Sequence, residues 1–401
     1  MVYTPEKEII EKYADVFVKC ALNSGKGIKK GDVVYLQVSE CARLLYVALR
    51  NSILKAGGTT ITNYIPDDTA REYYELASEE QLRSFPKKYM RGLVDEIDHS
   101  IFIISETNKH ELEGLDPKKI MTRSKALKPY KEWRDEKENK GKFSWTLGLY
   151  ATPAMAKEAK LTLKQYWNEI IKACFLDEKD PILKWKEVFS EVERLRKKLN
   201  SLKIERLHVK GEGVDLIIGL GEGRNWLGGT GRNIPSFEVF ISPDWRLTSG
   251  TIEFNQPLYR YGSLIEGIKL KFEKGLITKA IATKNEKLLA EMIATDDGSN
   301  KIGEYSLTDS RLSRITKFMA ETLFDENIGG KYGNTHIAIG NAYQDSYPGN
   351  PSKVSKEKWK KLGYNKSIVH TDIITTTKRT VTATLANGVE KVIYKDGQFT
   401  I

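Results

Sequence analysis

The pattern of apolar residues changes near residue 200, and this change constrains the fold more than any other feature of the chain. Before it, stretches with apolar residues at helical spacing alternate with short apolar runs typical of strands, such as Val33–Val38 and Ser100–Ser105. After it, short strand-like runs follow one another closely, with turns between them. We therefore expect an α/β domain over residues 1–200 and a strand-rich α+β domain over residues 201–401.

The composition is that of a soluble globular protein. Of the 401 residues, 40% are hydrophobic and 29% are charged, which argues against disorder. No apolar run approaches the roughly 20 residues needed to span a bilayer, so we expect no membrane partner. The first 22 residues carry acids and lack the basic and apolar regions of an export signal. These features predict a cytoplasmic protein.

The net charge of +10 raises the question of a nucleic-acid partner. Lysine and arginine are scattered along the chain and interleaved with acids, with no basic stripe containing aromatic residues. We therefore expect a solvated surface of mixed charge and no bound nucleic acid. The three cysteines Cys20, Cys41 and Cys174 are odd in number and far apart, which is typical of core thiols in a reducing compartment.

The five histidines divide into two groups. His99 and His110 have charged neighbours and are expected at the surface, and His208 alternates out of an apolar strand. His336 and His370 lie inside apolar β-runs, where an imidazole must be hydrogen-bonded or bound to a metal. These last two are the candidates for chemistry.

A set of potential metal ligands surrounds these two histidines. His370 and Asp372 are two residues apart on an expected strand, so both side chains project to the same face. His336 lies in a second strand, and Glu238 and Glu304 both adjoin strands. Such a set suits a pair of divalent ions that activate water. From spacing alone, this interpretation and a hydrogen-bonded pair with no metal both stay open.

Two glycine-rich segments do not match nucleotide-binding motifs. GKGIKKGD precedes its strand and lacks the Lys-Ser/Thr pair of a phosphate loop. The glycine spacing in GLGEGRNWLGGTGRN matches neither the dinucleotide-binding fingerprint nor the phosphate loop. We interpret the second segment as a loop that positions the neighbouring Glu238.

Four blocks of sequence resemble the thermophilic-type metallo-aminopeptidases, the aminopeptidase T and aminopeptidase S group. The likeness covers nearly the whole chain, and each block contains at least one candidate ligand. The blocks occur in the family's order: GRNIPSFEVFISP (231–243), IGEYSLTD (302–309), LFDENIGGKYGNTHIAIGNAY (323–343) and SIVHTDII (367–374).

The resemblance implies roles for individual residues. It makes Glu304 the bridge between two metal ions, within the ligand set Glu238, Glu304, His336, His370 and Asp372. Glu326 of the DEN triplet matches a family glutamate at the metal centre, either as a ligand or as the general base. Tyr343 matches a tyrosine that could donate a hydrogen bond to the oxyanion, the alternative being a core aromatic residue.

The implied activity is removal of the N-terminal residue from peptides by water that two divalent ions activate. Zinc, cobalt, manganese and magnesium all suit the ligand set, and the family suggests a homodimer. The alternative is a ring-cleaving dioxygenase on a related fold, with one Fe(II) held by His336, His370 and Asp372. That alternative would leave Glu238 and Glu304 without a role.

Overall fold

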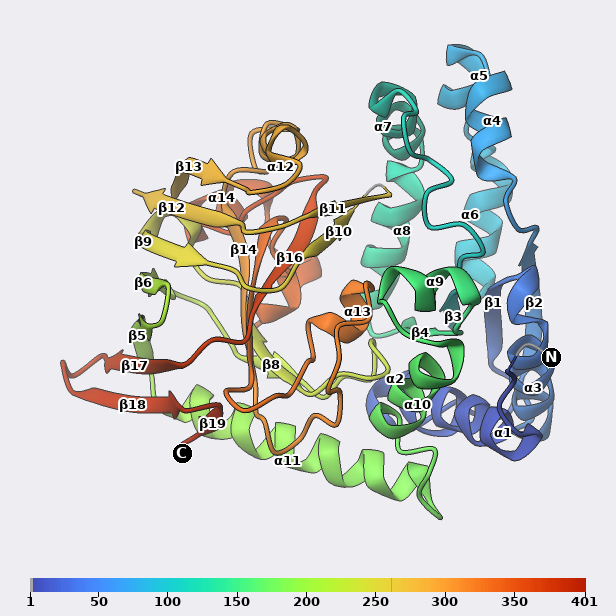
Figure 1. Ribbon diagram of the computed structural model, residues 1–401, viewed down its shortest axis with the longest axis horizontal. Coiled ribbons are helices and arrows are strands. Elements are labelled where there is room, and N and C mark those ends of the chain that lie inside the picture. The colour runs from blue at the N-terminus through green and yellow to red at the C-terminus, as the bar shows by residue number, and fades with distance from the viewer. Residues whose placement is uncertain (1–2, 261) are drawn as a thin grey trace. The chain divides into compact units, whose positions relative to one another are not determined.

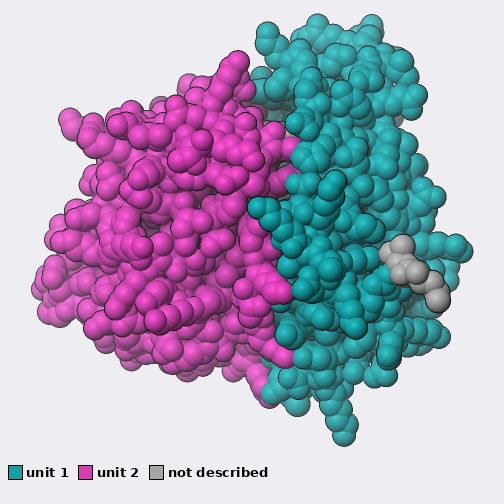
Figure 2. Space-filling view, in the orientation of Figure 1, with its two compact units in different colours: residues 1–186, 230–234 teal, residues 187–229, 235–401 magenta. Residues whose placement is uncertain are grey.

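The computed structural model describes residues 3–260 and 262–401 (Figure 1) and divides the chain into two compact units (Figure 2). The first unit comprises the chain up to Lys186 together with Thr230–Ile234, and the second comprises Glu187–Gly229 and Pro235–Ile401. The division falls inside helix α11 (Pro181–Ser201). Two domains divided at residue 200 stay a prediction.

The first unit contains a four-stranded parallel sheet with the order β2-β1-β3-β4. Helix α3 (Arg43–Lys55) connects the first two strands, as a parallel pair requires a crossover. The predicted alternation of helices and strands in this half is confirmed. The strands are β1 (Val33–Ser39), β2 (Thr59–Ile65), β3 (His99–Ile104) and β4 (Ser144–Leu149).

The remaining helices of this unit are short. The first begins at Lys7 and continues through a π-helical turn, Phe17–Ala21. Helix α10 begins with a capping box in which Thr162 and Gln165 exchange hydrogen bonds. The helices are α1 (Lys7–Val16), α2 (Leu22–Gly25), α4 (Ala70–Leu76), α5 (Glu79–Arg83), α6 (Lys87–Glu96), α7 (Pro117–Ala126), α8 (Lys128–Asn139), α9 (Pro153–Glu158) and α10 (Leu163–Ala173).

The prediction that His99 lies at the surface is wrong. His99 is the first residue of β3 and is buried. Its Nε2 atom lies 2.9 Å from Asp32 Oδ2, and its Nδ1 atom lies 2.8 Å from Ser144 Oγ. The charged residues that suggested exposure lie at the end of helix α6 and in the bend after it. His110, by contrast, is exposed as expected.

The cysteines follow the expectation only in part. Cys20 and Cys174 are buried, whereas Cys41 is partly exposed. Burial raises the pKa of the Cys20 thiol to about 11, although the charge of Lys186 opposes the shift. None of the three forms a disulfide within the described residues.

The second unit contains a large antiparallel sheet with the strand order β13-β12-β9-β6-β5-β17-β18-β19. Its strands are β5 (Ile204–Gly211), β6 (Val214–Gly219), β9 (Thr248–Glu253), β12 (Lys269–Glu273), β13 (Leu276–Ile281), β17 (Arg379–Leu385), β18 (Glu390–Lys395) and β19 (Gln398–Phe399). A separate hairpin joins β10 (Leu258–Arg260) to β11 (Ser263–Ile265), and the helices are α12 (Glu286–Ile293), α13 (Thr322–Asp325) and α14 (Lys356–Leu362).

A second antiparallel sheet has the order β16-β15-β14-β8-β7. Strands β8, β14 and β15 are buried at every residue, so polar side chains along them need partners inside the protein. The strand-rich second half is confirmed. The strands are β7 (Leu227–Gly228), β8 (Glu238–Ile241), β14 (Ile302–Thr308), β15 (Asn334–Gly340) and β16 (His370–Thr375).

Within the described part of the chain, no helix combines the length and the apolar character that crossing a membrane requires.

Candidate metal centre

The register of the five-stranded sheet gathers the predicted ligands. Side chains alternate between the two faces of a strand, and the antiparallel pairings of β8, β14, β15 and β16 are regular around these positions apart from a shift next to Glu304. As a result, five predicted residues share one face: Glu238, Glu304, His336, His370 and Asp372. Residues far apart in the sequence therefore meet at one place.

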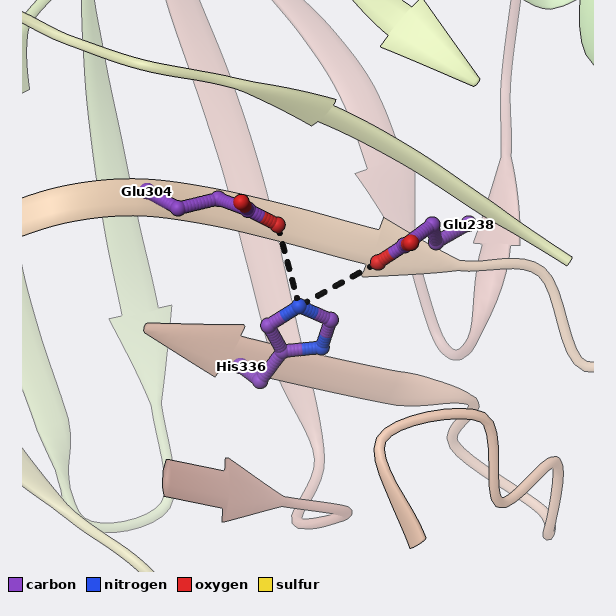
Figure 3. A group of neighbouring side chains, drawn as sticks. All are labelled: Glu238, Glu304 and His336. Carbon is purple, nitrogen blue, oxygen red and sulfur yellow. Dashed lines mark hydrogen bonds and ion pairs between the residues drawn. The ribbon is translucent and has the colours of Figure 1, made fainter. Parts of the chain in front are cut away.

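His336 lies at the centre of this group. Its Nε2 atom lies 3.2 Å from Glu238 Oε2 and 3.3 Å from Glu304 Oε1, and Figure 3 shows both carboxylates directed toward this nitrogen. Asp372 Oδ1 lies 3.9 Å from the same atom. The side chain of His336 is only 1% exposed, so these charges meet away from solvent.

His370 faces the other side of Glu304. Its Nε2 atom lies 3.8 Å from Glu304 Oε2 and 3.6 Å from Asp372 Oδ1. Its Nδ1 atom lies 2.8 Å from the carbonyl oxygen of Asn341. A carbonyl oxygen only accepts hydrogen bonds, so Nδ1 carries the proton. In the neutral imidazole, the lone pair is then on Nε2 and points toward the carboxylates.

Two serines that the sequence analysis missed hold Glu238 in place. Ser306 Oγ donates to Glu238 Oε2 at 3.0 Å, and Ser236 Oγ donates to Oε1 at 3.2 Å. Ser306 lies two residues after Glu304, on the same face of β14. The period of two along a strand was the signal that could have identified it.

Glu326 approaches the same region from outside the sheet. It follows α13 directly and is buried, and Asn327 Nδ2 donates to its Oε1 atom at 3.4 Å. One ligand atom each from Glu326, His336 and Asp372 lies within 4.8 Å of the others. The same is true of Glu238, Glu304 and His336. The two triads share His336.

Tyr343 lies just beyond the end of β15. Its ring centroid is 4.9 Å from that of the His370 imidazole, at an interplanar angle of 65°, and 5.9 Å from that of Phe240. The predicted tyrosine is therefore next to a candidate ligand. All seven residues that the sequence analysis selected thus lie at or beside this face.

The electrostatics of the group favour a bound cation. Burial raises the pKa of Glu304 to about 7, with the charge of Glu238 adding to the shift and a hydrogen bond with His336 opposing it. Burial and the charges of Glu238 and Asp372 hold the pKa of Glu326 well above its ordinary value. Several carboxylates meet here with little solvent to screen them, and divalent cations would offset their repulsion.

The pKa of His336 is raised despite burial, which lowers it, because the hydrogen bonds with Glu238 and Glu304 outweigh that effect. The potential ligand atoms are imidazole nitrogens and carboxylate oxygens, and such atoms bind zinc, cobalt and manganese. The residues therefore fit a metal centre of the kind found in metalloenzymes.

Comparison with known proteins identifies the class and the family. Residues 6–399 match the family model described as thermophilic metalloprotease (M29), and the chain belongs to this family. The chain is therefore a metallo-aminopeptidase, a hydrolase that acts on peptides with the help of divalent metal.

Individual relatives are similar along nearly their entire length. Aminopeptidase T of Thermus thermophilus is 30% identical over 390 residues, which cover 91% of this chain and 92% of the relative. Aminopeptidase PepS of Streptococcus thermophilus is 28% identical, with 100% of both chains covered.

A solved structure, wild-type AmpT from Thermus thermophilus, superposes with a TM-score of 0.85 at 26% identity, covering 98% of this chain and 100% of that chain. The alternative of a ring-cleaving dioxygenase receives no support from these comparisons.

Proposed function

We propose that the chain removes N-terminal residues from peptides with a pair of divalent ions held on one face of the five-stranded sheet. The observation that carries this proposal is the position of Glu304, whose Oε1 atom faces His336 and whose Oε2 atom faces His370. A carboxylate with each oxygen directed to a different imidazole has the arrangement of a bridging ligand.

The triad of Glu238, Glu304 and His336 supports the assignment of ligands, as does the approach of His370 to Glu304 and Asp372. In the proposal, one ion would be held by Glu238, Glu304 and His336. The other would be held by His370 and Asp372 together with Glu304. Ser306 and Ser236 orient Glu238, and the Asn341 carbonyl orients His370. Such outer hydrogen bonds fix the direction of ligand lone pairs. Zinc, cobalt, manganese and magnesium are the candidate ions.

When bound, divalent ions would supply Lewis-acid activation of water and of the scissile carbonyl. Glu326 accepts a proton as the water oxygen bonds to the carbonyl carbon, and then gives that proton to the leaving nitrogen as the C–N bond breaks. Tyr343 donates a hydrogen bond to the developing oxyanion. Glu326 lies beside the candidate ligands His336 and Asp372. This proximity is compatible with a role as a ligand and with proton transfer, and the proposal takes proton transfer.

The substrate in this proposal is a peptide with a free α-amine. A divalent ion held at the site, or a carboxylate that is not engaged as a ligand, would bind this amine. We further propose a cytoplasmic homodimer that binds neither nucleic acid nor membranes, in line with the interleaved charges of the sequence.

Acetylation of the α-amine tests this proposal. A leucyl peptide and its Nα-acetylated form are incubated with the metal-loaded enzyme, and release of free leucine or acetyl-leucine is followed by chromatography. We expect cleavage of the free peptide and none of the acetylated one, because the acetyl group removes the basic amine that the site would bind. Equal rates on both peptides would identify an endopeptidase instead.

A further inference from the structure

Asn327 is a fully buried residue whose side chain joins two parts of the site. Its Oδ1 atom accepts a hydrogen bond from the backbone N–H of Phe237 at 2.8 Å. Its Nδ2 atom donates to the carbonyl oxygen of Leu323 at 3.3 Å and to Glu326 Oε1 at 3.4 Å. Phe237 directly precedes Glu238. One amide group therefore connects the segments that carry Glu238 and Glu326.

We infer that Asn327 is a positioning residue that fixes the Glu326 carboxylate relative to Glu238. The inference rests on the proposed function, in which Glu238 is a ligand and Glu326 transfers the proton. Glu326 follows a helix of only four residues, and the chain from there to β15 is irregular. A carboxylate on such a segment keeps its position only if it is tied to a rigid strand. Asn327 provides this tie, because Phe237, to which it is hydrogen-bonded, directly precedes β8.

The chemistry of the amide explains why this residue is asparagine. The position requires an acceptor toward Phe237 and a donor toward two oxygen atoms, and an amide supplies both in one planar group. An aspartate has the same shape but presents an oxygen where the donor stands. In its ionised form it would repel Glu326 and leave the Leu323 carbonyl unpaired.

The backbone of Asn327 is held without its side chain. Its N–H donates to the Phe324 carbonyl oxygen at 3.0 Å, and its own carbonyl oxygen accepts a hydrogen bond from Ser313 Oγ. A substitution at this position therefore removes the link between Glu326 and Glu238 while the main-chain contacts stay in place.

The test compares Asn327→Asp with a matched control, Asn200→Asp. The Asn200 amide also forms two hydrogen bonds with the backbone of one residue: it accepts from the Trp226 N–H at 2.8 Å and donates to the Trp226 carbonyl oxygen at 3.2 Å. Within the described residues, no contact links it to the carboxylates of the site. Asn327→Ala is a second variant that removes the donor and adds no charge. Circular dichroism verifies that each full-length variant is folded.

Three measurements are made on each cobalt-loaded protein: the visible absorption spectrum of the bound cobalt, the amount of cobalt retained after dialysis against a chelator, and kcat and KM on a leucyl amide. We expect both Asn327 variants to change the absorption spectrum of the bound cobalt. We also expect either kcat or the affinity for cobalt to decrease by roughly 10–100-fold. KM should change much less than kcat. The control should match the wild type.

A folded Asn327 variant with the wild-type spectrum, cobalt retention and kcat would overturn the inference and reduce the residue to a helix-terminal hydrogen bond. Failure of the proposed function is a separate outcome, because the wild-type protein itself would then bind no cobalt or fail to hydrolyse the leucyl amide.

Discussion

Glu304 Oε2 lies 3.8 Å from His370 Nε2, although strand β15 separates the strands that carry these two residues. The other oxygen of Glu304 faces His336, on the intervening strand, at 3.3 Å. The side chain thus reaches across its neighbour and contacts both imidazoles. This relationship underlies the proposed role of Glu304 as a bridge.

The substitution Glu304→Gln should abolish hydrolysis and leave the fold intact. Glutamine keeps the shape but replaces one oxygen by an NH2 group, which cannot bind a cation. We expect a loss of at least about 100-fold in kcat and fewer retained ions per chain. Elemental analysis and steady-state kinetics measure both. Wild-type turnover with full metal content would exclude the bridging role.

The substitution Glu326→Gln distinguishes the two roles that the family resemblance allows for this residue. As the group that transfers the proton, Glu326 contributes roughly 10²–10⁴-fold to kcat, and its replacement should leave the metal content unchanged. As a ligand, its replacement should release an ion. Metal analysis of the purified variant beside its kcat decides between them, and the proposal made above expects the first result.

The buried contacts of His99 predict a stability effect remote from the chemistry. His99→Phe should lower the free energy of unfolding by about 1–3 kcal/mol, because Asp32 and Ser144 lose a buried hydrogen-bond partner. Urea denaturation measures the change. His110→Phe is the control, since the contacts of His110 with Glu113 and Glu158 are at the surface, where such pairs contribute about 0–1 kcal/mol. Equal effects of the two substitutions would contradict this account.

The buried thiol of Cys20 predicts a loss of stability at alkaline pH. Burial raises its pKa from 9.0 to about 11, so the unfolded chain releases this proton first as the pH rises. The protonated thiol therefore contributes up to about 2–3 kcal/mol to the free energy of unfolding. This contribution is complete below about pH 9 and is lost as the pH approaches 11.

Urea midpoints at pH 8 and pH 10.5 test this prediction with the wild type and Cys20→Ala, which has no thiol to ionise. The wild type should lose more stability between the two pH values than the variant does. The same loss in both proteins would show that other groups dominate the alkaline transition.

Strand periodicity made much of the site predictable. His370 and Asp372 were expected on one face because they are two residues apart, and the structure places them so. The ligands on other strands could be paired only through the family resemblance, because the register between β8, β14 and β15 is set by contacts distant in sequence.

The parts that the sequence did not predict have physical reasons. Strand β14 contains Glu304, Ser306 and Thr308 among its buried residues, and these polar residues weaken the apolar pattern of a buried strand. The role of Asn327 depends on an irregular segment that has no periodicity to read. His99 is buried although its neighbours are charged, because charges at the end of a helix and in the bend after it say little about the first residue of a parallel strand.

The most direct test of the central claim is the metal content per chain, measured by elemental analysis together with hydrolysis of a leucyl chromogenic amide in the same preparation. The account predicts about two divalent ions per chain, loss of hydrolysis on chelation, and recovery when zinc, cobalt or manganese is added back. A single ion per chain with full activity would contradict the two-metal proposal.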